Sequence, residues 1–269
     1  MATRRWKSAF LPAPDGVALH YRRSVGPGRC WVFLHGFADS GSTWDRVGGR
    51  MPAHADLVLI DARNHGRSGR GPGGHQRQVA DVIAVLERLD VDAPVVVGHS
   101  IGARTATGVA AARPDLVGRL VLLDPPWRDG PGSDSGPDPD RLAAVRQEIS
   151  GLCASSPSQL LRLARSRHPD WDAADYPAWV ESKQQTGAAA AADLTPVPWR
   201  PLAGTLAVPT LLVHGDPTSG GIVTGAVARA FAALARDVTV HHVAGRGHHL
   251  HREDLDQAVA ILTAAGKPR

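Results

Sequence analysis

The sequence predicts an α/β fold in which a mostly parallel β-sheet is covered by helices on both faces. Short apolar runs bounded by turn residues recur along the chain, as is typical of buried strands. Helical patterns with three- and four-residue spacing separate several of these runs. Because two parallel strands need a crossover connection, and the helices supply it, this alternation favours parallel pairing.

Seven segments are expected to form strands: residues 17–24, 30–34, 57–60, 95–97, 120–123, 210–213 and 238–243. The clearest helix is marked by apolar residues on a single face: Val79, Val82, Ile83, Leu86 and Leu89. A second helix, rich in alanine, begins at Ile101 and stops at Pro114. These elements are expected to build the core.

The alternation is interrupted once, after the strand that ends at residue 123. A loop rich in proline, glycine and aspartate follows, and then only helical signals until Val208. Ser156, Pro157 and Gln159 form a typical helix start, with a serine N-cap and a glutamine that reaches back to it. We therefore expect a core made of residues 1–125 and 202–269, interrupted by a helical insertion over residues 126–201.

Composition excludes several classes of protein. Hydrophobic residues make up 43% and charged residues 21% of the chain, a balance typical of a globular protein. The net charge of +4 is spread over scattered arginines without a block of like charges, so no nucleic-acid partner is expected. The chain offers no apolar run of membrane-spanning length and no signal-peptide pattern, and its two cysteines suggest no disulfide framework. A soluble, cytoplasmic protein is expected, and its oligomeric state stays open.

The strongest chemical signal is the pentapeptide Gly98-His-Ser100-Ile-Gly102, which follows an apolar strand and opens a helix. In a nucleophile elbow of this kind a sharp turn exposes the serine hydroxyl, and the flanking glycines leave room for the strained backbone. The helix N-terminus favours negative charge that develops beside it. Ser100 is therefore the predicted nucleophile.

A serine hydroxyl needs a base at neutral pH, and His248 is the best placed of the 13 histidines. It follows the last predicted strand through a glycine-rich turn, which would bring it to the carboxyl edge of the sheet. Its neighbours His249 and His251 are alternatives. His241 and His242 lie within the strand pattern and are expected to be structural.

The base in turn needs an acid that orients it, and two aspartates follow strand ends. Asp216 is preferred because it keeps the chain order Ser, Asp, His of the elbow motif. Asp124 is the alternative. For the oxyanion hole, the backbone N–H groups of Ile101 and Phe37 are predicted, the second from the loop after an earlier strand, where His35 would brace the loop.

Taken together, the motifs resemble the α/β-hydrolase superfamily, in its serine-nucleophile branch with a cap. The resemblance rests on five motifs in the family's order: His35-Gly36-Phe37, Asp61 to Ser68, Gly98 to Gly102, Gly215-Asp216 and Gly247-His248. It implies an α/β-hydrolase fold, a helical cap between strands six and seven, and the site residues named above. The chain departs from the family pattern in two places. Asp216 directly follows the strand-end glycine, and Arg104 stands where a small residue would be easier to bury.

The resemblance implies a hydrolase without a cofactor, which cleaves an ester, lactone, amide or related carbonyl bond of a small, apolar molecule through an acyl-enzyme. Ser100 in place of an aspartate argues against the epoxide-hydrolase and dehalogenase branches. The alternative is a non-hydrolytic tailoring enzyme, such as a cyclase or an enzyme that cleaves carbon–carbon bonds, or a ligand-binding protein on the same fold. No metal site or nucleotide motif is expected.

Tryptophan is concentrated in the predicted insertion. Four of the seven tryptophans, Trp127, Trp171, Trp179 and Trp199, lie there. They can serve as packing anchors between insertion and core. The alternative is that one or more of them line an apolar substrate pocket above Ser100.

Overall fold

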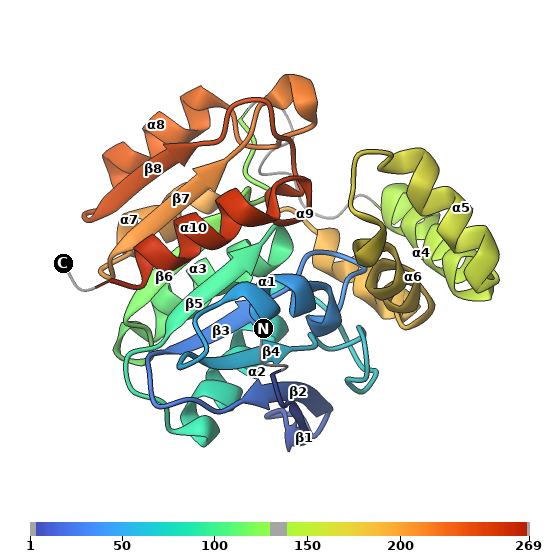
Figure 1. The fold of residues 1–269 in the computed structure, drawn as a ribbon, viewed down its shortest axis with the longest axis horizontal. Coiled ribbons are helices and arrows are strands. Elements are labelled where there is room, and N and C mark those ends of the chain that lie inside the picture. The colour runs from blue at the N-terminus through green and yellow to red at the C-terminus, as the bar shows by residue number, and fades with distance from the viewer. Residues whose placement is uncertain (1–3, 130–138, 268–269) are drawn as a thin grey trace.

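The computed structural model describes residues 4–129 and 139–267, and it is built around one eight-stranded sheet (Figure 1). The strands are β1 (Lys7–Pro12), β2 (Ala18–Ser24), β3 (Cys30–Leu34), β4 (Asp56–Ile60), β5 (Val95–His99), β6 (Arg119–Leu123), β7 (Thr210–His214) and β8 (Val238–His242). Their order in the sheet is β1-β2-β4-β3-β5-β6-β7-β8. β2 pairs antiparallel with both β1 and β4, and the other pairs are parallel. The expected mostly parallel sheet is confirmed.

The seven strands expected from the sequence correspond to β2 through β8, and β1 is an additional strand. It lies at the edge of the sheet, and none of its six residues is buried. Because an exposed edge strand needs no apolar run, periodicity gives little signal for it.

Helices cover both faces of the sheet, as expected. The core helices are α1 (Asp45–Arg50), α2 (His75–Leu89), α3 (Ile101–Ala112), α7 (Trp199–Thr205), α8 (Gly225–Leu234), α9 (Leu250–Glu253) and α10 (Leu255–Ala265), with the short 3₁₀ helices η1 (Gly41–Trp44), η2 (Pro114–Leu116) and η5 (Pro217–Ser219). Residues of α2, α3, α7 and α8 share one buried cluster, and residues of α1, α9 and α10 share the other. In β3, Val32 and Leu34 belong to the first cluster and Trp31 and Phe33 to the second, the alternation that a strand between two layers requires.

The segment between β6 and β7 is helical, which confirms the predicted cap. It contains α4 (Pro139–Ala154), α5 (Pro157–Arg167), α6 (Tyr176–Gln184), and the 3₁₀ helices η3 (Ala173–Asp175) and η4 (Ala188–Leu194). In Figure 1, α4, α5 and α6 form a lobe beside the sheet. The predicted start of α5 is present: Ser156 Oγ accepts from Gln159 N–H, and the Gln159 side chain accepts from Ser156 N–H. The division of the chain at residues 126 and 201 stays a prediction. Helix α7, which begins at Trp199 inside the predicted insertion, packs into the core cluster.

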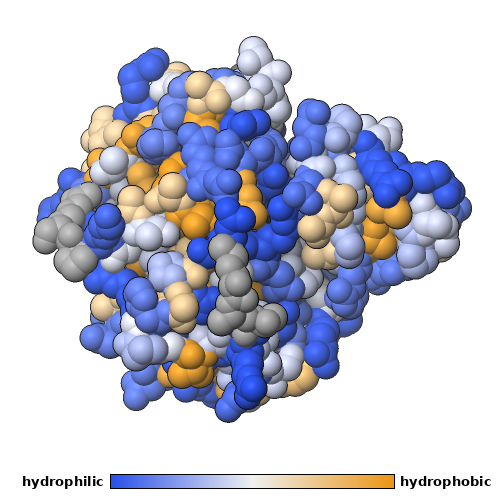
Figure 2. All heavy atoms as spheres, in the orientation of Figure 1, coloured by the Kyte–Doolittle hydropathy of each residue, from blue (hydrophilic) through white to orange (hydrophobic). Residues whose placement is uncertain are grey.

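The surface is mostly polar on the face shown in Figure 2, where apolar side chains form small, separate groups. Large apolar residues exposed among the described residues are Phe10, Val25, Leu234 and Val240. Across the described ranges, no helix is long and apolar enough to cross a bilayer.

Candidate active site

Ser100 occupies the sharp turn between β5 and α3. Its backbone has φ 53° and ψ −121°, a conformation that L-residues rarely adopt and that is maintained only where the surroundings enforce it. The Ser100 N–H donates to the carbonyl of Leu123 in the neighbouring strand β6 (3.0 Å). A Cβ atom at Gly98 would lie 2.4 Å from the Gly102 carbonyl oxygen, and one at Gly102 would lie 2.4 Å from that of Leu34. Both glycines are therefore required by close packing around the turn.

His248 lies in the loop between β8 and α9, and its Nδ1 is 2.6 Å from Oδ2 of Asp124. Because the carboxylate accepts the Nδ1–H, the other ring nitrogen, Nε2, is left to act as a base. Ser100 and His248 line the same cavity. Asp124 is fully buried, whereas the His248 side chain is 20% exposed. The geometry thus pairs a shielded carboxylate with an imidazole that lines the cavity.

Asp124 directly follows β6 and is held in place by the loop after β7. Its Oδ2 accepts from Ile222 N–H (2.8 Å) and its Oδ1 from Val223 N–H (3.0 Å). Its backbone is left-handed, with φ 41°, which turns the chain at the end of the strand. Two amides and the imidazole thus satisfy the hydrogen-bonding capacity of this buried carboxylate.

The structure pairs His248 with Asp124, the alternative, and not with Asp216, the acid preferred from the sequence. Asp216 lies at the end of β7 and faces the neighbouring strand β8, where its Oδ1 accepts from His242 Nε2 (2.5 Å). Its Oδ2 accepts from Gly245 N–H (2.6 Å). Both oxygens are thus engaged away from His248. The loop that follows Asp216 instead supplies the two amides that hold Asp124.

The neighbouring histidines have other positions. His251 is buried and stacks on Trp44, with ring centroids 4.5 Å apart, and the His249 ring packs against His168 and Trp171. The described residues show no contact of either ring with Asp124, so of the three histidines only His248 is paired with it. His241 and His242 are exposed residues of β8.

His99, which sequence reasoning did not single out, links the turn at Ser100 to the loop that carries His248. Its Nε2–H donates to the backbone carbonyl of His248 (2.9 Å). Burial, with His248 and His251 nearby, holds the His99 pKa well below its ordinary value, so the ring stays neutral. The residue next to Ser100 in the chain therefore fixes the loop that carries His248. Its only signal in the sequence is its place between Gly98 and Ser100.

The two predicted oxyanion donors flank Ser100. Phe37 follows β3 and lines the cavity that contains Ser100 and His248, and Ile101 is the first residue of α3. In the described ranges neither backbone N–H has a hydrogen-bond partner. Both are therefore available to a ligand, and their role stays a prediction.

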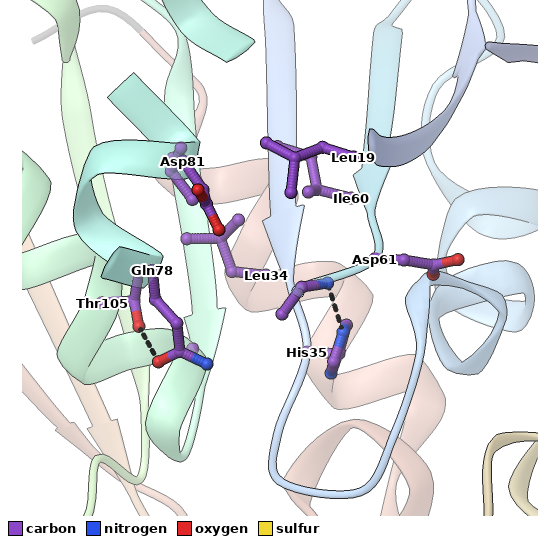
Figure 3. Close-up of a pocket in the computed structure, with 11 residues that line it drawn as sticks. Leu19, Leu34, His35, Ile60, Asp61, Gln78, Asp81 and Thr105 are labelled. Atoms are coloured by element: carbon purple, nitrogen blue, oxygen red, sulfur yellow. Dashed lines mark hydrogen bonds between the residues drawn. The ribbon is translucent and has the colours of Figure 1, made fainter. Parts of the chain in front are cut away.

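His35 braces the loop that carries Phe37. Figure 3 shows residues that line a small cavity behind this loop, where the ring of His35 accepts a hydrogen bond from Ala62 N–H (3.0 Å). Its Nδ1–H donates to the carbonyl of Gly36 (2.8 Å). Burial lowers the His35 pKa, which agrees with one nitrogen donating and the other accepting. His35 thus acts as a structural link between the loops after β3 and β4.

Two cavities meet at Ser100. The first, called the cap pocket here, lies between Ser100, the loop after β3 and helices α4 and α6; its lining includes Phe37, Asp39, Glu148, Trp179, Lys183 and His248. The second, called the arginine pocket, lies between Ser100, α3 and the end of the cap segment; its lining includes Ile101, Arg104, Arg128, Arg141, Trp199 and Ile222. A substrate on Ser100 can extend into either one.

Two of the four tryptophans of the predicted cap line a pocket at Ser100, and the other two pack against aromatic rings outside both pockets. Trp179 lines the cap pocket and Trp199 the arginine pocket. Trp127 lines neither pocket and is 1% exposed, stacked on Trp199 and packed against Phe231 in the core. Trp171 stacks on His168 and also lies outside both pockets. A pocket role thus stays a prediction for Trp179 and Trp199, whereas Trp127 and Trp171 lie in packing contacts outside both pockets.

A buried ion cluster supports the wall of the cap pocket. Asp39 accepts from Arg252 Nη2 (2.9 Å) and from Lys183 Nζ (3.2 Å), and all three residues are buried. Burial alone would raise the pKa of Asp39, but the two cations outweigh it and hold that pKa well below its ordinary value. Lys183 belongs to α6 in the cap, Asp39 to the loop after β3, and Arg252 to α9. The cluster joins cap and core, and nothing in the local sequence around these residues indicates it.

Arg104, unexplained by the sequence, ties the end of the cap segment to α3. Its Nη1 donates to the carbonyl of Thr195 (2.9 Å) and its Nη2 to that of Asp193. The side chain is buried one turn after Ser100. It is therefore a cross-link between the elbow helix and the segment that returns from cap to core.

Asp193, which lies where the chain returns from the cap to the core, makes the stability of the fold depend on pH. It is fully buried, its Oδ1 accepts from Gly74 N–H (2.7 Å), and burial raises its pKa to about 7. An ordinary aspartate titrates near 4, so between that pH and about 7 the folded chain binds a proton that the unfolded chain has lost. The contribution of Asp193 to stability therefore falls as pH rises through this window.

We expect Asp193→Asn to remove this fall in stability with rising pH. As pH rises from 5 to 8, the free energy of unfolding of the variant should increase by about 2 kcal/mol relative to that of the natural chain, because an amide does not ionise. Urea denaturation at the two pH values measures it. Exposed Asp92 provides the control, and Asp92→Asn should leave the pH dependence unchanged. Equal pH dependence in Asp193→Asn and the natural chain would contradict the assignment.

A strained serine between strand and helix, a histidine paired with a buried aspartate and a helical cap above them are features of one class of enzyme. The chain belongs to the alpha/beta hydrolase family, whose model matches residues 31–261. It is an enzyme of the hydrolase class. Among the described residues, no group of three or more histidine, cysteine or acidic side chains could hold a metal ion.

The chain is similar over most of its length to two curated hydrolases. It is 28% identical over 248 residues to an N-formylmaleamate deformylase of Pseudomonas putida, covering 90% of each chain. It is 26% identical over 257 residues to a 2-(acetamidomethylene)succinate hydrolase of Mesorhizobium japonicum, covering 90% of this chain and 89% of the relative. Both relatives are hydrolases of small molecules.

Solved structures share the fold. A crystal structure of E-2-(acetamidomethylene)succinate hydrolase superposes with a TM-score of 0.80 at 21% identity, covering 97% of this chain and 98% of the other. An esterase from Exiguobacterium antarcticum gives 0.80 at 16% identity, covering 97% and 100%. At this level of identity the likeness supports the fold alone.

Proposed function

We propose that this protein is a serine hydrolase that needs no cofactor and cleaves an ester, lactone or amide bond of a small molecule through an acyl-enzyme. The observation that carries the proposal is the hydrogen bond from His248 Nδ1 to buried Asp124, at the edge of the cavity that also contains Ser100. That bond fixes the tautomer in which Nε2 can take a proton from a serine hydroxyl.

In the first half of the reaction, Ser100 Oγ attacks the carbonyl carbon while His248 Nε2 takes the hydroxyl proton. The carbonyl oxygen becomes an oxyanion, which the N–H groups of Phe37 and Ile101 stabilise. The bond from carbon to the leaving oxygen or nitrogen then breaks, and His248 returns the proton to the leaving group. The acyl group is left on Ser100.

In the second half, water attacks the acyl carbon and gives a proton to His248. The bond between that carbon and Ser100 Oγ breaks, the acid product leaves, and the proton returns to Ser100. Throughout, Asp124 keeps the imidazole oriented and stabilises its protonated form. Amides belong to the proposed substrates because the two relatives that cover most of the chain are named for a formylated maleamate and an acetamido-bearing succinate.

Labelling by a fluorophosphonate probe tests the nucleophile directly. We expect the natural chain to be labelled once per molecule, and Ser100→Ala to lose the label and at least about 10⁴-fold in kcat/KM for a small ester, because no other group can form the acyl-enzyme. Intact-mass spectrometry and ester turnover measure the two effects.

A matched control is Ser182→Ala, which changes a buried serine of α6. It should keep both label and turnover. A folded chain that takes up no label would contradict the proposal and favour a ligand-binding or non-hydrolytic role on the same fold.

A further inference from the structure

The arginine pocket carries a concentration of positive charge beside the nucleophile. Arg104 and Arg128 line it, and the described residues of its lining include no carboxylate side chain. Ser100 lies in the same lining, so a group bound there belongs to a molecule within reach of the nucleophile. The remaining wall is mostly apolar, with Trp199 and Ile222.

Arg104 is a buried cation without an ion-pair partner in the described part of the chain. It is 3% exposed, its two hydrogen bonds go to backbone carbonyls, and its Nε has no partner there. Burial lowers its pKa to about 10, so the guanidinium stays charged at neutral pH. Asp193 is the acid that acts on it most, and the pKa of that acid lies near 7. A buried charge so poorly compensated is costly, and an incoming anion would lower that cost.

Arg128 supplies a second cation from a different part of the chain. It follows β6 and the loop residue Trp127, and its exposed side chain pairs with none of the described residues. Arginine presents a planar fork that binds a carboxylate with two parallel hydrogen bonds. A buried arginine on α3 and an accessible one after β6 can therefore approach one carboxylate from two sides.

The cap pocket does not offer the same environment. Lys183 lines it, but its ammonium is engaged by Asp39 and by the carbonyl of Ala38 (2.6 Å). Arg167 lines it together with Glu148, whose carboxylate is 3.7 Å away. Each cation of that pocket faces an acid of the same pocket. The charge excess thus lies on the Arg104 side of Ser100.

We propose that the arginine pocket binds a carboxylate carried by the substrate, so that the enzyme prefers esters or amides of molecules that also bear a free acid group. This inference rests on the proposed serine-hydrolase function and adds a substrate class to it. The carboxylate would be held by Arg104 and Arg128 while the scissile carbonyl lies at Ser100.

Matched pairs of esters test the inference. In one pair the acyl chain ends in a carboxylate or a methyl group (4-nitrophenyl adipate monoester against 4-nitrophenyl hexanoate). In the other the leaving group carries the acid or lacks it (4-carboxyphenyl acetate against phenyl acetate). The readout is the ratio of kcat/KM for the charged and the neutral ester. Intrinsic reactivity cancels when this ratio is compared between variants.

We expect Arg128→Gln to lower the ratio about tenfold for at least one pair, because a charge-assisted hydrogen bond is lost. Arg104→Met should lower it further, and turnover of the neutral ester reports whether the site stays assembled in that variant. Arg162→Gln removes the same charge from an exposed position of α5 outside both pockets and should leave the ratio unchanged. The inference would be overturned if the ratio were unchanged in all three variants. If the neutral ester were still turned over in a Ser100-dependent way, the hydrolase function would stay intact.

A binding measurement tests the anion site separately from the hydrolase function. Adipate should raise the melting temperature of Ser100→Ala, and adding Arg128→Gln should weaken that shift. If no ester is hydrolysed and adipate still binds through Arg128, the anion site stands and the hydrolase proposal falls. If adipate has no effect and the ester ratios do not change, the anion site is wrong.

Discussion

Asp124→Asn should lower kcat/KM for a good ester substrate by about 10⁴-fold, the loss expected when the acid of a serine triad becomes an amide. The fully buried carboxylate accepts from His248 Nδ1 and from two backbone amides. An asparagine can turn its NH₂ group toward the imidazole and force the proton onto Nε2, which removes the base. Steady-state kinetics on purified, folded protein measures this effect.

Asp216→Asn is the matched control, since it makes the same chemical change at the end of the neighbouring strand. Asp216 bonds His242 and Gly245, so its variant should keep kcat/KM within about threefold of the natural chain. A large loss in Asp216→Asn, with turnover retained in Asp124→Asn, would contradict the assignment drawn from this geometry.

Asp39→Asn should destabilise the fold by about 3–5 kcal/mol at pH 7 because it leaves Lys183 and Arg252 buried without their shared counter-charge. The double variant Asp39→Asn with Lys183→Met removes one of the two cations and should recover part of the loss. Urea denaturation followed by tryptophan fluorescence measures both. A change below about 1 kcal/mol in the single variant would show that the cluster contributes little.

The same cluster predicts how stability changes in acid. The pKa of Asp39 is held below its ordinary value in the fold, so its contribution to stability is complete above the unfolded pKa near 4. As pH falls from there toward the folded pKa, the contribution is lost. The difference in stability between the natural chain and Asp39→Asn should therefore shrink below about pH 4.

Most of the fold could be predicted from the sequence, because buried strands and helices leave periodic apolar patterns. The strand before Ser100 and the helix after it were visible in this way, as were the capping residues of α5. β1 was not, since no residue of this edge strand is buried. The cap was recognisable as a helical segment between two strand signals, but its side-chain positions depend on packing between distant segments.

The candidate site could be predicted only where one segment carries the information. Ser100 and His248 stand in distinctive local patterns. The choice of acid depends on which strand end faces the base, and two aspartates in equivalent local contexts, Asp124 and Asp216, could not be separated by spacing. The roles of His99 and Arg104 come from contacts with backbone carbonyls far along the chain, and no sequence pattern encodes those.

The bond between Arg104 and the returning cap segment has a consequence for how such enzymes can diversify. The acceptors are main-chain carbonyls of residues 193 and 195, which any amino acid provides. Side chains on that segment can therefore vary without breaking the attachment. A replacement cap would keep this attachment if its return segment followed the same backbone path, and it would also need a cation in the place of Lys183 to pair with Asp39. Sequence change along the returning segment is therefore compatible with an unchanged elbow helix.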